Sequence, residues 1–132
     1  MRTLDEIAEA RYVSVTTFRR SGAPVATPMW VARSRDEVVL ISIDGQGKTK
    51  RLAHTPRVEL RLCDIRGRVP DGSPVWHGTA RLVRDLDGVD EVRRAMSAKY
   101  PMARVGNLVE DLLGHWMGRK QRVGIRITVA AG

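Results

Sequence analysis

The chain has 132 residues, 42% of them hydrophobic and 29% charged, which excludes a disordered protein and fits one globular domain over residues 1–132. No apolar run approaches the roughly 18 residues of a transmembrane helix, and the N-terminus lacks the apolar segment of a signal peptide. The single cysteine, Cys63, excludes an intrachain disulfide. We therefore expect a protein of the reducing cytoplasm that has no membrane anchor.

The first 18 residues predict a short helix followed by a strand. Thr3 and Glu6 have the spacing of a capping box, and an apolar stripe continues from there to about Ala10. Residues 12–18 then alternate in polarity and are rich in β-branched and aromatic side chains. This pattern is typical of a strand.

Two further strands are predicted over residues 25–33 and 37–43. Pro28 interrupts the first of them, and because proline cannot donate to a ladder it indicates a bulge, a sheet edge or a place where the ladder gives way to a ligand. The second has a continuous apolar middle, which predicts a strand buried on both faces. A short helix then begins near Lys48 and ends before Pro56.

The remaining residues alternate between strand and helix patterns. Further strands are predicted over 57–64, 75–86 and 122–129, and further helices over 87–99 and 108–117. Strands joined by short turns, with few helices between them, favour an antiparallel sheet. The predicted fold is mainly β with peripheral helices, in which six strands close into a small barrel.

Positive charge is concentrated in one part of the chain. The formal net charge is +8, and residues 48–68 hold seven cationic side chains against two acidic ones. A focused positive patch attracts an anion, such as nucleic acid, an acidic membrane or a phosphorylated cofactor. The sequence therefore predicts an anionic ligand without identifying it.

The helix predicted near Lys48 begins with the wrong charge for a helix N-terminus, whose free N–H groups are already partly positive. Its first turn holds Lys48, Lys50 and Arg51. Each such cation costs a few tenths of a kcal/mol up to about 1, whereas a bound anion reverses the sign. Gly45 and Gly47 would let the backbone approach that anion closely. We interpret this stretch as a cradle for phosphate or carboxylate, with a solvated basic turn as the alternative; the P-loop pattern is absent.

Side chains for acid–base, covalent or metal catalysis are not evident. The three histidines are far apart and lack metal-ligand spacing, Cys63 has no neighbouring base, and no G-x-S-x-G motif frames a serine. Trp30 and Trp76 are interpreted first as core or interface packing. We therefore expect no metal and no catalytic side chain, and infer that a bound cofactor carries the reaction, as hydride transfer allows.

Five short motifs occur in an order and spacing that a known family shares. They are Thr16-Thr17-Phe18-Arg19 with Gly22, Pro24, Thr27-Pro28 and Trp30; Gly47-Lys48 with Lys50-Arg51-Leu52; Pro56-Arg57-Val58; Cys63-Asp64 with Arg66-Gly67; and Gly78-Thr79-Ala80. In these motifs the chain resembles the flavin/deazaflavin oxidoreductase superfamily, in particular its pyridoxamine-phosphate-oxidase-like, F420-dependent group of actinobacteria. The resemblance implies a six-stranded split β-barrel that forms a homodimer, with the cofactor in a groove at the subunit interface.

The resemblance also implies which residues bind the cofactor. Lys48, Lys50 and Arg51 would bind the phosphate and the acidic tail of the deazaflavin. The ring would be lined, mainly through backbone groups, by Thr27, Pro28, Met29 and Trp30. Further contacts would come from the strand that enters the phosphate loop and from the next strand and loop, at Ser42, Arg61, Cys63, Asp64 and Arg66. The chain departs from the family at His54-Thr55-Pro56, where an Asn-Pro pair is common.

The predicted function is an F420H2-dependent reductase. It would transfer hydride from the deazaflavin to a small electron-poor acceptor such as a quinone, an enone or a tetrapyrrole like biliverdin. FMN is the alternative cofactor, but a long polyanionic tail suits the additional cations better than a single phosphate does. A basic ligand- or nucleic-acid-binding module is a further alternative, disfavoured by an aromatic content of 5% and by the absence of RNP, KH and zinc-finger patterns.

Overall fold

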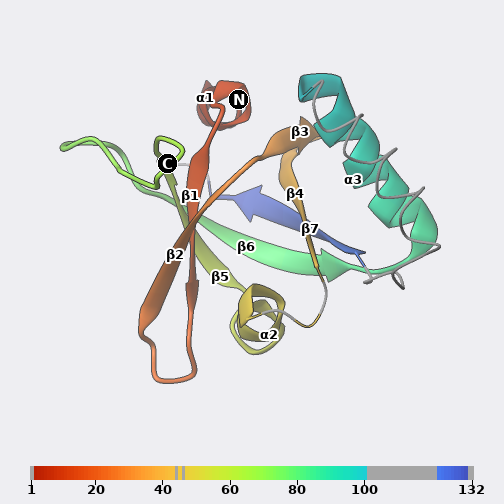
Figure 1. Ribbon diagram of the computed structural model, residues 1–132, viewed down its shortest axis with the longest axis horizontal. Helices are drawn as coiled ribbons and strands as arrows, with labels where there is room; N and C mark the ends of the chain where they lie inside the picture. The colour runs from red at the N-terminus through yellow and green to blue at the C-terminus, as the bar shows by residue number, and fades with distance from the viewer. Residues whose placement is uncertain (1, 44, 46, 101–121, 131–132) are drawn as a thin grey trace.

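The structure, a computed structural model, describes residues 2–43, 45, 47–100 and 122–130 (Figure 1). The described residues form seven strands and three helices. The strands are β1 (Val13–Phe18), β2 (Pro24–Met29), β3 (Ala32–Ser34), β4 (Glu37–Ile43), β5 (Arg57–Leu62), β6 (Trp76–Val83) and β7 (Arg122–Val129). The helices are α1 (Arg2–Glu9), α2 (Gly47–His54) and α3 (Leu86–Lys99).

All seven strands belong to one antiparallel sheet, in the order β2-β1-β5-β6-β7-β4-β3. The two edge strands, β2 and β3, are consecutive in the chain and are separated by Trp30 and Val31 alone. A mainly β, antiparallel fold with peripheral helices was predicted and is confirmed. The prediction of six strands that close into a barrel is not confirmed, because residues 25–33 form two strands and the described sheet has β2 and β3 as unpaired edges.

The interruption in residues 25–33 occurs at Trp30 and Val31 and not at Pro28, where it was predicted, but the sheet edge that Pro28 was taken to indicate is confirmed. Pro28 lies inside β2, opposite Ser14 of β1. Proline is tolerated there because β2 is an edge strand, which needs only part of its N–H groups for pairing. At Val31 the backbone N–H and carbonyl bond instead to side chains of Lys99 and Tyr100. The ladder ends where these side chains replace a neighbouring strand.

Other boundaries follow from local capping. Helix α1 begins at Arg2, so Thr3 lies within the helix and the predicted capping box is wrong. Strand β6 ends at Val83, earlier than predicted, because Asp85 caps α3 and its carboxylate accepts a 2.8 Å hydrogen bond from the N–H of Gly88. The strands predicted over 37–43 and 122–129 match β4 and β7. The helix predicted over 108–117 lies outside the described residues.

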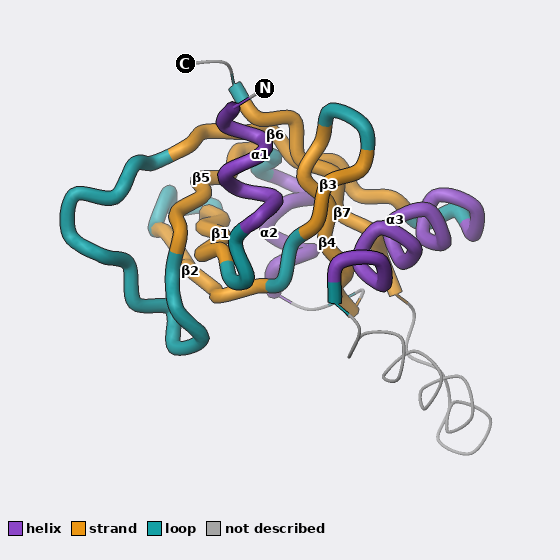
Figure 2. The backbone as a smooth tube through the Cα atoms, turned by 90° about the horizontal axis from the view of Figure 1, so that it is seen from above, coloured by secondary structure: helices purple, strands orange, loops and turns teal. Residues whose placement is uncertain are grey.

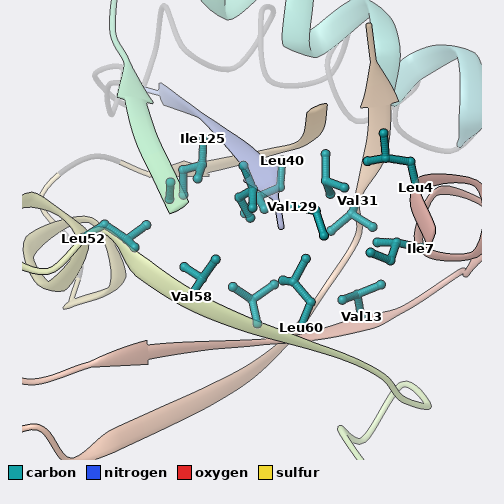
Figure 3. Packing of buried hydrophobic residues seen from close by; sticks show 14 residues of the cluster. Leu4, Ile7, Val13, Val31, Leu40, Leu52, Val58, Leu60, Ile125 and Val129 are labelled. Carbon is teal, nitrogen blue, oxygen red and sulfur yellow. The ribbon is translucent and has the colours of Figure 1, made fainter. Parts of the chain in front are cut away.

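The main hydrophobic core fills the inner side of the curled sheet and is closed by helices at both ends. Leu4 and Ile7 of α1 enter the core from one end, and Leu52 of α2 enters from the other (Figure 3). Between them lie aliphatic side chains of β1, β4, β5, β6 and β7, among them Leu40 and Leu60. Fully burying one such side chain contributes about 2 kcal/mol. Helix α2 is therefore held against the sheet by Leu52.

Helix α3 covers the other face of the sheet at β3, β4 and β7 (Figure 2). A second cluster packs Val92 and Met96 of α3 against Val39 of β4. Because Val38 and Leu40 belong to the inner core, β4 is buried on both faces, which confirms the prediction from its continuous apolar run. In the described part of the chain, no helix is long and apolar enough to cross a membrane.

The end of α3 is attached to two distant segments by a group that we call the α3 clamp, Lys99 and Tyr100. The Lys99 ammonium donates to the carbonyls of Ala10 (2.5 Å) and Val31 (2.6 Å). The Tyr100 hydroxyl accepts from the Val31 N–H (3.2 Å) and lies 2.8 Å from the Val31 carbonyl. The Tyr100 ring stacks on Trp30, with centroids 4.5 Å apart. The clamp therefore fixes the link between β2 and β3.

Candidate functional site

Helix α2 carries the basic cluster, which we define as Lys48, Lys50 and Arg51. The helix spans Gly47–His54, which confirms the helix predicted in this stretch, and its first turn contains no acidic residue. Just before it, Gly45 has a φ of 82°, a left-handed backbone conformation that glycine adopts without strain. Lys48 and Lys50 lie in the first turn, where the free N–H groups are partly positive, whereas Arg51 belongs to the last turn, so its predicted place in the first turn is wrong.

Arg51 is attached to strand β1 through its side chain. Its Nε donates a 2.6 Å hydrogen bond to Oγ1 of Thr17. Its Nη1 lies 2.7 Å from the position that a Cβ would occupy at Gly47, so the guanidinium covers the first turn of α2. This is the direction in which helical side chains lean. The position of the guanidinium depends on Thr17 on one side and on the missing side chain of Gly47 on the other.

Lys48 is half-buried and lies close enough to Arg51 for the two charges to repel each other. Burial lowers the pKa of Lys48 below its ordinary value of 10.5, and the positive charge of Arg51 lowers that pKa further. Both effects disfavour the charged ammonium in the free protein. A bound anion would offset both, because it attracts the two side chains and the N–H groups of the helix. Lys50 is exposed.

The residues predicted to line a cofactor ring lie on strand β2. Thr27, Pro28 and Met29 are half-buried. Among the described elements β2 pairs with β1 alone, so its outer edge presents backbone groups to a ligand. Trp30 lies just beyond the strand, with its ring stacked on Tyr100. The packing interpretation of Trp30 therefore agrees with the structure, and its ring is oriented by the α3 clamp.

The basic cluster and the ring-lining segment lie within the reach of one ligand. Thr17, which binds Arg51, is paired with Val25 of β2. Pro28 is three residues further along β2, which corresponds to about 10 Å at the rise of an antiparallel strand. A molecule with a phosphate at one end and a ring at the other could therefore contact both places.

Arg61 lies on the opposite face of the sheet from Arg51. It donates to Oγ1 of Thr16 (3.3 Å) and to Glu59 (3.1 Å), whereas Arg51 binds Thr17. Successive residues of a strand point to opposite faces, so the two arginines are separated by β1. The structure of this chain therefore does not bring Arg61 together with the basic cluster.

The loop after β5 is organised by Asp64. One carboxylate oxygen of Asp64 accepts hydrogen bonds of 2.9 Å from the N–H groups of both Arg66 and Arg68. Gly67 has a φ of 84°, and a Cβ built there would lie 3.5 Å from Cδ of Pro28, so the loop packs beside β2. Asp64 thus shapes the loop with the carboxylate that was predicted to bind cofactor. Arg66 is exposed and borders the ring-lining segment.

Ser42 and Cys63 occupy the ends of two strands. Ser42 is 5% exposed, pairs opposite Val123, and lies on the same side of β4 as the core residue Leu40. Cys63 follows β5 and is half-buried. Burial raises the pKa of the Cys63 thiol, and the charge of Asp64 raises that pKa further. A raised pKa lowers the thiolate fraction at neutral pH, so Cys63 is poorly suited to nucleophilic chemistry.

Two features of the site were not predicted from the sequence. Thr17 was recognised as part of a motif but not as a partner of Arg51. The available signal was its position in the alternation of β1, where Val13 and Val15 face the core and a threonine follows. The α3 clamp was missed altogether. Among the described residues, no three histidine, cysteine or acidic side chains are close enough together to hold a metal ion.

Comparison with known families identifies the fold. The sequence profile of the pyridoxamine 5'-phosphate oxidase family matches residues 2–132. The chain belongs to this family. The predicted resemblance to the flavin and deazaflavin oxidoreductases is thereby confirmed. No curated protein matches the chain closely enough to count as a relative.

Solved structures of the same fold have varied descriptions. A conserved hypothetical protein from Mycobacterium tuberculosis is 24% identical, with a TM-score of 0.72 over 98% of this chain and 79% of that one. A structure described as an F420 reductase is 18% identical, with a TM-score of 0.58 over 96% and 93%. An FAD-binding protein from Mesorhizobium loti is 19% identical, with a TM-score of 0.61 over 98% and 89%. At these identities the similarity shows the fold alone.

Proposed function

We propose that the protein is a reductase that uses the deazaflavin F420 and transfers hydride to a small electron-poor acceptor, such as a quinone, an enone or a tetrapyrrole. The observation that carries the proposal is that Lys48 and the guanidinium of Arg51 lie at the first turn of α2, while Thr17, which binds that guanidinium, is about 10 Å along the sheet from the part of edge strand β2 that could support a ring. Membership of the pyridoxamine 5'-phosphate oxidase family also supports the proposal.

The donor groups at α2 have the chemistry that a phosphate requires. Lys48 supplies a compact charge, Arg51 supplies terminal guanidinium nitrogens, and the first turn of the helix supplies N–H groups. Gly47 leaves room for the Arg51 guanidinium beside that turn. A phosphorylated cofactor therefore fits the residues that are present. When bound, a reduced deazaflavin supplies the hydride.

The residues of this chain would bind and orient, and the proton that the acceptor takes up after the hydride would come from solvent water, so no side chain is assigned an acid–base role. Backbone groups on the outer edge of β2, within the segment from Thr27 to Met29, would support one side of the ring. Trp30, held by Tyr100, would keep the end of that strand in place. The rate advantage would come from holding the acceptor and the ring at reacting distance.

F420 is preferred over FMN because of the charge that surrounds the phosphate site. The single phosphate of FMN needs few cations. Lys50 and Arg66 are two further, exposed cations, which would suit the acidic tail of F420. The F420 reductase and the FAD-binding protein among similar structures support a flavin-type cofactor. FMN remains the second candidate.

The same proposal includes a homodimer, in which a second copy completes the cofactor groove and the split barrel, and a cytoplasmic location. Titration of the purified protein with F420, FMN and FAD, followed by fluorescence, tests the cofactor. We expect F420 to bind at concentrations on the order of tens of micromolar or below. A wild-type protein that binds FMN but not F420 would reassign the cofactor, and one that binds none of them would refute the proposal.

A further inference from the structure

A buried hydroxyl lies on the otherwise apolar inner side of strand β1. Val13, Val15 and Thr17 alternate along this side, and their exposed fractions are 0%, 1% and 1%. Valine has nearly the shape of threonine but lacks a polar atom, so burying a hydroxyl here is unfavourable unless the hydroxyl has a partner. The partner is Nε of Arg51, at 2.6 Å.

The hydrogen bond from Arg51 to Thr17 determines what the rest of the guanidinium can do. Arginine presents its donors in a rigid planar fork, so fixing Nε also fixes the directions of Nη1 and Nη2. Nη1 lies against the first turn of α2, beside Gly47. Within the described residues, neither Nη1 nor Nη2 has a hydrogen-bond partner. The fork is therefore held in place while its outer donors remain available to a ligand.

We propose that Thr17 is a positioning residue for anion binding, whose hydroxyl holds Arg51 so that the outer guanidinium nitrogens and Lys48 bind one phosphate at the N-terminus of α2. This inference rests on the proposed function, and it assigns a role to a residue that would not touch the cofactor. It also explains why the inner side of β1 is polar at the position next to α2 and apolar elsewhere.

A purely structural role is the competing explanation. In that case the Thr17–Arg51 bond would only attach α2 to β1, as Leu52 also does. Breaking the bond would then lower the melting temperature of the protein and leave its affinity for ligands unchanged. The positioning role requires a loss of affinity whatever the melting temperature does, because the charge of Arg51 remains and its orientation is lost.

The test compares Thr17→Val, Thr17→Ser, Arg51→Ala and the double variant Thr17→Val/Arg51→Ala by fluorescence titration with F420 and by thermal shift with inorganic pyrophosphate. We expect Thr17→Val to bind F420 about ten-fold more weakly than wild type, roughly the loss that follows when one charge-assisted contact is misplaced. Thr17→Ser retains the hydroxyl and should stay within about two-fold of wild type. Because Thr17 acts through Arg51, the double variant should bind no more weakly than Arg51→Ala alone.

Two results would overturn the proposal: wild-type affinity in Thr17→Val, or additive losses in the double variant. If Thr17→Val does not fold, Thr17→Ala answers the same question, because it also removes the hydroxyl and leaves the Arg51 guanidinium intact. Thr17→Ala should also lose about ten-fold in affinity, and wild-type affinity in this variant would count against the proposal. If wild type binds neither F420, FMN nor pyrophosphate, the proposed function fails as well; if wild type binds and Thr17→Val binds equally, only the role of Thr17 fails.

Discussion

Replacing Lys48 by alanine should change ligand affinity and stability in opposite directions. Lys48 is half-buried, its pKa is lowered by burial and by Arg51, and it stands in the first turn of α2. In the ligand-free protein its charge is therefore unfavourable. Removing a cation from a helix N-terminus contributes about 0.3–1 kcal/mol, and alanine is also the better helix former. Ligand-free Lys48→Ala should be more stable than wild type by up to about 1 kcal/mol.

The affinity of the same variant should fall. A hydrogen bond between charged groups is worth about 1.5–3 kcal/mol, so the loss of Lys48 should weaken F420 binding by roughly ten-fold to one-hundred-fold. Thermal unfolding with and without F420 measures both effects, because about 1 kcal/mol shifts the melting temperature by roughly 3–5 °C in a chain of this size. Wild type should melt below the variant without ligand and above it when F420 is saturating for wild type.

Lys50→Ala is the matched comparison, since it removes the same charge from the same helix at an exposed position that is assigned to the acidic tail and not to the phosphate. Because water screens an exposed contact, we expect Lys50→Ala to weaken F420 binding less than Lys48→Ala. If Lys48→Ala melts well below wild type without ligand and binds F420 normally, then Lys48 supports the fold and the assignment of α2 as an anion site is wrong.

Three further predictions concern other parts of the molecule. Gly47→Ala should weaken F420 binding several-fold, because the added methyl group would displace the Arg51 guanidinium. The melting temperature should not fall, because alanine favours helices by about 1 kcal/mol over glycine. Unchanged affinity would contradict the close approach of the guanidinium to Gly47. Asp85→Ala should cost about 1 kcal/mol in denaturant unfolding while Asp85→Ser costs little, and equal losses would contradict the capping role. Burial lowers the pKa of Lys99 from 10.5 to about 8, so between these values the unfolded chain holds a proton that the folded protein has lost. The stability difference between wild type and Lys99→Met, measured as the free energy of unfolding, should therefore rise from pH 8 to pH 10. A fall in this difference would show that the carbonyls of Ala10 and Val31 stabilise the Lys99 ammonium.

Local periodicity was sufficient to predict much of the sheet. The bounds of β4 and β7 were predicted correctly from the apolar run over 37–43 and the alternation over 122–129. Both patterns depend only on residues that are neighbours in the sequence. The basic helix was predicted for the same reason, from glycines and cations within a few residues of each other. The structural role of Asp64 in its loop was not predicted, although an Asp followed shortly by Gly67 is also a turn signal.

The parts that were missed depend on residues far apart in the chain. The strand predicted over 25–33 is interrupted before Ala32 because Lys99 and Tyr100 bind the backbone of Val31, and neither residue is near Val31 in sequence. The hydrogen bond between Arg51 and Thr17 likewise joins two elements, α2 and β1, that are far apart in the sequence. No pattern within one segment identifies such pairs, whereas each is evident once the topology brings α2 beside β1 and α3 beside β3.

The α3 clamp has a consequence for the order in which the protein folds. Its contacts join residues separated by 68 to 90 positions, so the chain must close long loops before they form. The link between β2 and β3 therefore acquires its final shape only after α3 has docked. In native-state hydrogen exchange, the Val31 amide lies outside any strand yet should be protected like a core amide, because it is fully buried and bonded to Tyr100. Its protection would report directly on the docking of α3.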